Sequence, residues 1–126
     1  MKGHGTYKLE VNNNTITFKA YGAWNYETAE EWGRELKNIV VQMNNKPWAF
    51  LSNLTEWELI TPDAKEYISE LYSWFNKQNF KYLAIIYGHS VQKSLLEEHH
   101  KIFTNVEIEY FDDLDEAICW LNSVGF

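Results

Sequence analysis

Tyr82-Leu83-Ala84-Ile85-Ile86-Tyr87, residues 82–87, is the stretch that decides the fold. Successive side chains of a strand point to opposite faces of its sheet. This segment is apolar at both sets of alternating positions, a pattern typical of a central strand in a parallel sheet. It therefore predicts an α/β protein whose sheet is largely parallel.

The chain opens with two segments in which apolar and polar residues alternate. Residues 7–11 and residues 15–21 both show the two-residue period of a half-buried strand. Asn12, Asn13 and Asn14 separate them, and Asn tolerates the left-handed backbone angles of tight turns. We therefore expect an antiparallel β-hairpin at this end of the chain.

Helical and extended patterns then alternate along the rest of the sequence. Thr61-Pro62-Asp63 is a strong helix start, in which Thr61 caps the helix and Pro62 occupies its first turn. As a cap, Thr61 replaced by Ala is expected to cost about 0.5–2 kcal/mol of stability. The expected elements after the hairpin are a helix from Asn25 to about Met43, a strand at 48–54, a loop at 55–60, a helix from Thr61, a strand at 82–87, a helix after 88–90, a strand at the sheet edge at 106–110 and a last helix after 112–113.

The order ββαβαβαβα predicts a mixed, mostly parallel five-stranded sheet with four helices, because strands joined through helices run parallel. Apolar residues at helical spacing predict which side of each helix faces the sheet. In the last two helices these residues are Val91, Leu95, Ile102 and Phe103, and then Leu114, Ala117, Ile118 and Leu121.

The bulk composition limits the classes of partner. The 126 residues fit a single domain, residues 1–126, and the net charge of -7 with scattered basic residues argues against nucleic acid and anionic membranes. No apolar run approaches the roughly 20 residues of a transmembrane helix, and no signal peptide is evident. Cys119 is the only cysteine, so no internal disulfide forms and a cytoplasmic location is expected.

Three segments together with this order resemble the SpoIIAA-like fold of STAS domains. Residues 20–25 (AYGAWN) look like the second strand entering the first helix, and residues 50–54 (FLSNL) with residues 61–63 (TPD) look like the strand and helix around the family's regulatory site. The resemblance implies a non-catalytic domain for protein interaction or regulation, like the anti-sigma-factor antagonists. The Asp-Ser-Ser-Gly-like turn of the phosphorylated members is replaced by Ile60-Thr61-Pro62-Asp63-Ala64, although Thr61 offers a hydroxyl.

Candidate site residues gather after the strands. Trp24 and Trp57 are expected in loops at the carboxyl edge of the sheet, where with Leu59 and Ile60 they could line a pocket or partner surface, or instead plug the core. Asn53 and Thr61 belong to the same region. His89 and Ser90 follow the strand at 82–87, a place that favours ligands in open α/β sheets, although Ser90 as a simple helix cap is the stronger interpretation.

No convergent catalytic, metal or cofactor set is visible. Glu97 and His100 have the Glu-x-x-His spacing of di-metal helical bundles, but the motif occurs once, and a solvated helix face with Glu97 pairing Lys101 is the better interpretation. We therefore expect no metal, no cofactor and no enzymatic activity. Two functions stay open: a protein-interaction domain, and a module that binds a small apolar ligand or a lipid, as SEC14-like proteins do.

The doubly apolar segment at 82–87 also predicts self-association. If each strand adds to one edge of the sheet by a right-handed crossover, all connecting helices lie on one face. One set of apolar side chains, either Tyr82, Ala84 and Ile86 or Leu83, Ile85 and Tyr87, would then face solvent. An exposed apolar patch marks an interface, and a two-fold homodimer is the commonest way to cover it. A doubly wound sheet, with helices on both faces, is the alternative.

Overall fold

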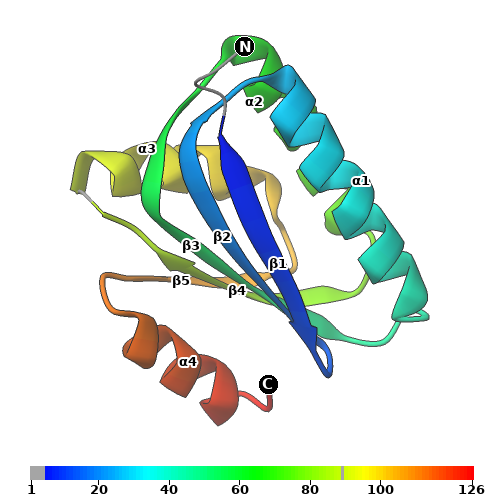
Figure 1. The fold of residues 1–126 in the computed structure, drawn as a ribbon. Coiled ribbons are helices and arrows are strands. Elements are labelled where there is room, and N and C mark those ends of the chain that lie inside the picture. Colours follow the sequence, from blue (N-terminus) through cyan, green and yellow to red (C-terminus); the bar gives the residue numbers. More distant parts are fainter. Residues whose placement is uncertain (1–4, 89) are drawn as a thin grey trace.

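The computed structural model describes residues 5–88 and 90–126, which form one five-stranded sheet with helices packed on both faces (Figure 1). The elements in chain order are β1 (Thr6–Asn12), β2 (Thr15–Trp24), α1 (Tyr26–Gln42), β3 (Trp48–Ile60), α2 (Pro62–Phe75), β4 (Phe80–Ile86), α3 (Ser90–His99), the 3-10 helix η1 (His100–Ile102), β5 (Glu107–Phe111) and α4 (Leu114–Ser123).

The strands lie in their sequence order, β1-β2-β3-β4-β5. β1 and β2 form the antiparallel hairpin, turned by Asn13 at a φ of 57°, and every later pair of neighbours is parallel. β5 forms an edge of the sheet. The predicted order ββαβαβαβα, with a mostly parallel sheet and four α-helices, is therefore confirmed within the described residues.

One face of the sheet carries the larger core. Buried side chains from α1, α2 and the α3–η1 segment pack there against Phe18, Phe50, Leu83 and Ile85 of the strands. This agrees with the expectation that helices connecting successive strands share one face, because right-handed crossovers in a sequential sheet leave no other arrangement. Aromatic rings fill much of this layer, and Trp48 and Phe80 stack with centroids 4.3 Å apart.

The other face is covered in part by α4, which corrects the expectation of an exposed apolar patch. Ala84 and Ile86 of β4 are buried, and they pack with Ala49 and Leu51 of β3 against α4. α4 follows the last strand, so it connects nothing and the crossover rule does not fix its face. This cover removes the argument for a dimer, and self-association itself stays a prediction.

The inward positions of the last two helices were predicted only in part. In α4, Ala117 and Leu121 are buried, whereas Leu114 and Ile118 are exposed because a helix on half of a sheet face buries a narrow stripe. In α3, Leu95 is 64% exposed and its neighbour Leu96 is buried in its place.

Residues 55–60 are a strand, not the expected loop. β3 runs on to Ile60 and stays paired with β2, whereas its pairing with β4 ends at Asn53 and Ile86. β4 itself is shifted from the predicted 82–87 to Phe80–Ile86. The β3 extension, residues 55–60, therefore has β2 on one side and no further strand on the other within the described residues.

A bulge lets β2 follow this extension. Consecutive residues Gly22 and Ala23 pair with Trp57 and Leu59, so the extra residue, Glu58, lies in β3, and Gly22 opposite the bulge takes a φ of +73° that glycine adopts readily. The strand continues through the bulge, so Trp24 ends β2 and does not lie in a loop as expected.

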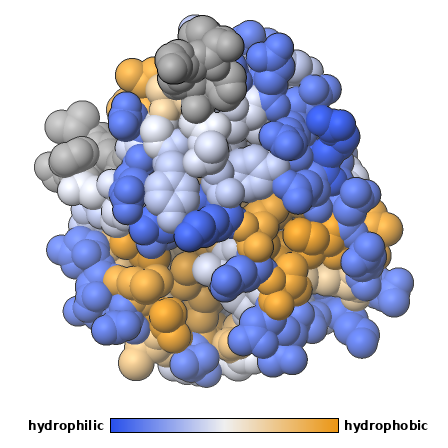
Figure 2. Space-filling view, in the orientation of Figure 1, coloured by the Kyte–Doolittle hydropathy of each residue, from blue (hydrophilic) through white to orange (hydrophobic). Residues whose placement is uncertain are grey.

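The surface in the orientation of Figure 1 is mixed (Figure 2). Its upper half is mostly hydrophilic or near neutral, with one apolar group at the upper left, whereas larger apolar groups gather in the lower half, over α4 and where the lower ends of β1 and α1 meet. Val11, Val41, Leu114 and Ile118 are among the large apolar residues exposed to solvent. No helix among the described residues has the length and hydropathy to span a membrane.

Candidate functional site

A pocket of about 140 Å³ opens between α2, α3 and the carboxyl-terminal parts of β2 and β3. Its walls are mostly apolar, and its few polar groups come from the helices. The lining residues are Phe18, Ala20, Trp24, Trp32, Leu54, Trp57, Ile60, Lys65, Ile68, Tyr72, Leu95, Leu96, His99 and His100.

Trp24 and Trp57, both candidates from the sequence, line this pocket from neighbouring strands. Trp24 is only 2% exposed and contributes to the core, which is one of the two alternatives from the sequence. Trp57 is half-buried and lines the pocket, which is the other. Ile60 also lines the pocket. Leu59 is 57% exposed and is not part of the lining, because it is the next residue along the strand and points to the other side.

Two buried indole N–H groups of the lining residues, those of Trp24 and Trp32, lack a hydrogen-bond partner among the described residues. The two rings meet edge to face, with centroids 5.3 Å apart. An unsatisfied buried donor costs about 1–3 kcal/mol. The Trp24 N–H lies beside Gly5, where a Cβ atom would come within 2.7 Å of the indole nitrogen, so it faces β1 and not the pocket.

Two adjacent histidines form the polar end of the pocket. His100 is buried, its Nδ1 lies 3.1 Å from the Tyr110 hydroxyl oxygen, and burial together with His99 lowers its pKa to about 3. His99 Nε2 lies 3.0 Å from Ser69 Oγ, and burial together with Lys65 lowers the His99 pKa. Burial also raises the pKa of Tyr110 to about 12. The imidazoles are therefore neutral at pH 7 and add no charge to the pocket.

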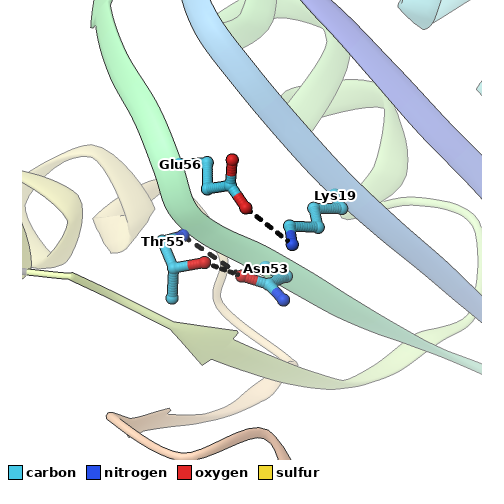
Figure 3. A network of polar contacts seen from close by, with 4 residues as sticks. All are labelled: Lys19, Asn53, Thr55 and Glu56. Carbon is cyan, nitrogen blue, oxygen red and sulfur yellow. Dashed lines mark hydrogen bonds and ion pairs between the residues drawn. The ribbon is translucent and has the colours of Figure 1, made fainter.

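Asn53 shapes the start of the β3 extension. Its side-chain oxygen accepts hydrogen bonds from the Thr55 N–H at 3.1 Å and from the Thr55 hydroxyl at 2.8 Å (Figure 3). The bond satisfies a backbone donor where the β2–β3 register shifts between Lys19 and Tyr21. Lys19 and Glu56 form an ion pair of 3.1 Å across the same two strands. We assign Asn53 a structural role, because its side-chain oxygen accepts the Thr55 N–H at the register shift.

Thr61 occupies the cap position of α2, but its side chain does not cap the helix. The Thr61 hydroxyl instead donates to Asp63 Oδ1 at 2.6 Å, and the same oxygen accepts the Ala64 N–H at 2.9 Å. The expected capping by Thr61 is therefore wrong, because the carboxylate of Asp63 takes that role in the first turn, where the helix dipole favours it.

Replacing Asp63 with Ala is expected to lower the free energy of unfolding by about 1 kcal/mol, because a backbone N–H loses its acceptor and the helix loses its N-terminal charge. Thr61→Ala is the matched control, since it removes a single exposed hydroxyl and is expected to cost less than about 0.5 kcal/mol. Urea unfolding of the two variants measures both values. A larger loss for Thr61→Ala would restore Thr61 as the cap.

The remaining candidates lie apart or outside the described residues. His89 lies outside them, as does the side chain of Ser90, whose backbone begins α3. Lys101 pairs with Glu98 at 3.2 Å, not with Glu97 as expected. Among residues 5–88 and 90–126, no three His, Cys, Asp or Glu side chains are grouped to hold a metal ion.

The sequence interpretation missed the helical wall of the pocket. Leu96 and His100 were not assigned to the inward side, although with the expected inward residues His99 and Phe103 they have the i, i+3, i+4, i+7 spacing of a helix face that packs on a core. This spacing was the available signal, and it was obscured by the stripe assigned to Val91 and Leu95. The α2 residues of the wall, such as Ile68 and Lys65, reach the pocket only through the packing of α2 on the sheet.

Comparisons with known proteins agree with this architecture. A family model described as SpoIIAA-like matches residues 15–122. An uncharacterized protein with a SpoIIAA-like fold from Shewanella loihica PV-4 is 21% identical, with a TM-score of 0.74 and 96% of each chain covered. No curated protein matches the sequence at a significant level.

Two structures with a regulatory role in their names share the fold. An anti-sigma factor antagonist from Mycobacterium paratuberculosis is 15% identical, with a TM-score of 0.63 over 97% of each chain. The phosphorylated form of the Bacillus cell fate determinant SpoIIAA is 11% identical, with a TM-score of 0.59 over 92% of this chain and 99% of that chain. At such identities the likeness concerns the fold, and function has to be argued from the site.

Proposed function

Because the chain belongs to the SpoIIAA-like family, we propose that it is a cytoplasmic protein-interaction module that performs no chemistry of its own and binds its partner at the pocket and the β3 extension. The observation that carries the proposal is an apolar pocket whose lining residue Leu95 is 64% exposed, beside a β3 extension whose Leu59 is 57% exposed on the other side of the strand. Apolar groups exposed together are typical of a partner surface.

The polar groups of the pocket support binding over catalysis. A general acid or base works best with a pKa near the ambient pH. The pKa of His100 lies near 3 and that of Tyr110 near 12, and each of these groups is already engaged with the other. Ser69 Oγ lies 3.0 Å from His99 Nε2, the distance of a nucleophile and its base, but among the described residues no carboxylate hydrogen-bonds the imidazole to complete a triad.

The environment of Thr61 supports a partner surface that is not switched by phosphate. The Bacillus relative has been solved in a phosphorylated form. Here the Thr61 hydroxyl lies 2.6 Å from the carboxylate of Asp63, so a phosphoryl group at this position would bring two negative charges into contact. We therefore propose constitutive binding, governed by the concentration of the partner.

The pocket also supports a second candidate, the binding of a small apolar molecule. A cavity of about 150 Å³ lined by apolar side chains holds benzene, whereas pockets for larger ligands occupy about 300–1,000 Å³. A volume of about 140 Å³ therefore suits a group of benzene size and is too small for a two-chain lipid. This favours a small ligand over the lipid of a SEC14-like protein.

Photocrosslinking in the native cells tests the proposed function. The crosslinking amino acid p-benzoylphenylalanine replaces Leu59 at the site, or Val41 on α1 as the control, and both positions are strongly exposed. We expect a discrete protein adduct, identified by mass spectrometry, from position 59 only. The proposal fails when position 59 gives no protein adduct, or the same adducts as position 41.

A further inference from the structure

The pocket between α2, α3 and the sheet combines an apolar interior with one charge, supplied by Lys65. We propose that it binds a small aromatic monocarboxylate, with the ring inside the pocket and the carboxylate paired with the Lys65 ammonium group. This inference rests on the second candidate of the proposed function and names the class of ligand. A ligand inside the pocket and a partner protein over its rim do not exclude one another.

Lys65 places its charge at the mouth of the pocket and not in the interior. It precedes Ile68 by three residues on α2, so both lie on one helix face, but Lys65 is exposed whereas Ile68 is buried. Among the described residues no carboxylate forms an ion pair with Lys65. The carboxylate of Asp63 is engaged instead by the Thr61 hydroxyl and the Ala64 N–H. The ammonium group can therefore pair with a ligand.

The single charge of the pocket favours a carboxylate over a phosphate. Lys65 is the one charged residue among the described lining residues, and the lowered pKa values of His99 and His100 keep both imidazoles neutral at pH 7. A carboxylate brings one negative charge, which the ammonium group matches. A phosphate monoester carries about two negative charges at pH 7, and the second would have no counterpart here.

The size and the walls of the pocket favour an aromatic ring as the apolar part. A cavity of about 150 Å³ holds benzene, and this pocket measures about 140 Å³. The rings of Phe18, Trp24 and Tyr72 are among its walls. Aromatic rings gain from edge-to-face and offset contacts with one another beyond the area that they bury. A benzene ring with its carboxylate at the mouth therefore fits better than a long aliphatic chain.

The net charge of -7 does not prevent an anion from binding at this site. At physiological ionic strength, interactions between exposed charges are largely screened beyond about 8 Å. The carboxylate would meet Lys65 at contact distance, beside apolar walls, where screening is weaker. The local positive charge then outweighs the distant acidic residues.

An NMR titration of the 15N-labelled protein tests the proposal with benzoate and with its neutral isostere benzamide. The indole N–H signals of the tryptophans report where each molecule binds. We expect benzoate to shift the signals of Trp24 and Trp57, which line the pocket, and to leave Trp120 on the other face of the sheet unchanged. Benzoate is expected to bind more tightly than benzamide by about threefold or more, as an ion pair at a pocket mouth allows.

Lys65→Met removes the charge and keeps an unbranched apolar side chain. Lys77→Met is the matched control, because Lys77 is also exposed but lies beyond the other end of α2. The affinity for benzoate is expected to fall by about threefold or more in Lys65→Met and to stay unchanged in Lys77→Met. The affinity for benzamide is expected to stay unchanged in both.

Filling the pocket tests its location independently of the charge. Ala20→Leu fills it from its β2 wall, and Thr17→Leu places the same side chain on the opposite face of β2 as the matched control. Both ligands are expected to bind Ala20→Leu more weakly by about tenfold or more, and Thr17→Leu as they bind the unaltered protein. Circular dichroism and thermal melts verify folding, and Ile68→Phe serves as a second filled form.

The outcomes separate this inference from the proposed function. Equal affinities for benzoate and benzamide, or a Lys65→Met form that binds benzoate as tightly as the unaltered protein, overturn the carboxylate proposal while the small-ligand candidate stands. Benzoate shifts at Trp120 without shifts at Trp24 and Trp57, or undiminished binding to a folded filled form, overturn it as well. Binding of neither molecule overturns it together with the small-ligand candidate, and crosslinking at position 59 still decides the protein partner.

Discussion

Lowering the pH from 7 to 4 is expected to reduce the free energy of unfolding by about 3 kcal/mol through His100 alone. In the unfolded chain this histidine has a pKa of about 6.5, whereas burial lowers its pKa to about 3 in the folded protein. Between these values the unfolded chain binds a proton that the folded chain does not. The contribution is therefore complete above pH 6.5 and is lost as the pH falls toward 3, and His99 adds a loss of the same sign.

Urea unfolding at a series of pH values measures this loss, with His100→Gln as the matched variant. Glutamine can still hydrogen-bond the Tyr110 hydroxyl but carries no titratable group, so the variant should lose markedly less stability between pH 7 and pH 4. Parallel pH profiles for the two proteins would mean that the pKa of His100 is not lowered in the folded state.

Replacing Leu121 with Ala is expected to destabilise the protein by about 2–5 kcal/mol, because this buried side chain packs α4 against the second face of the sheet. The substitution leaves a cavity beside Leu51 and Ile86. Thermal or urea unfolding measures the difference directly.

Ile118→Ala is the matched control, since it shortens an apolar side chain in the same helix at a position that is 42% exposed. Its expected cost is below about 1 kcal/mol. Similar losses for the two variants would contradict the assigned face of α4. A loss for Ile118→Ala that depends on protein concentration would point to a second copy packing on α4 and would return the dimer to consideration.

The alternation of polar and apolar residues was sufficient to predict the order and type of the elements. It failed at residues 55–60, where Thr55, Glu56 and Glu58 are exposed and the pattern lacks a continuous buried side. These residues are extended because β2 keeps pairing with them across the bulge at Glu58. Tertiary pairing decides the conformation of such a segment, and local propensity does not report it.

The candidate site was predicted from its strands and missed from its helices. Trp24 and Trp57 stood out because large aromatic residues follow strand-like segments there. Lys65, Ile68 and Leu96 are spaced like ordinary helix residues, and only the packing of α2 and α3 on one face brings them to the pocket. The sequence also could not predict that α4 covers the second face of the sheet. A helix after the last strand joins no pair of strands, so the crossover rule does not determine on which face it packs.

Hydrogen exchange of the protein bound to the partner captured from position 59 tests the central claim most directly. The claim is that a partner protein binds along the β3 extension and its pocket. We expect the amide of Ile60, whose N–H points away from β2, to exchange at least tenfold more slowly in the complex, while those of Ala117 and Leu121 in α4 keep their rates. Protection confined to α4 or to β1, with unchanged exchange at residues 58–60, would contradict the account.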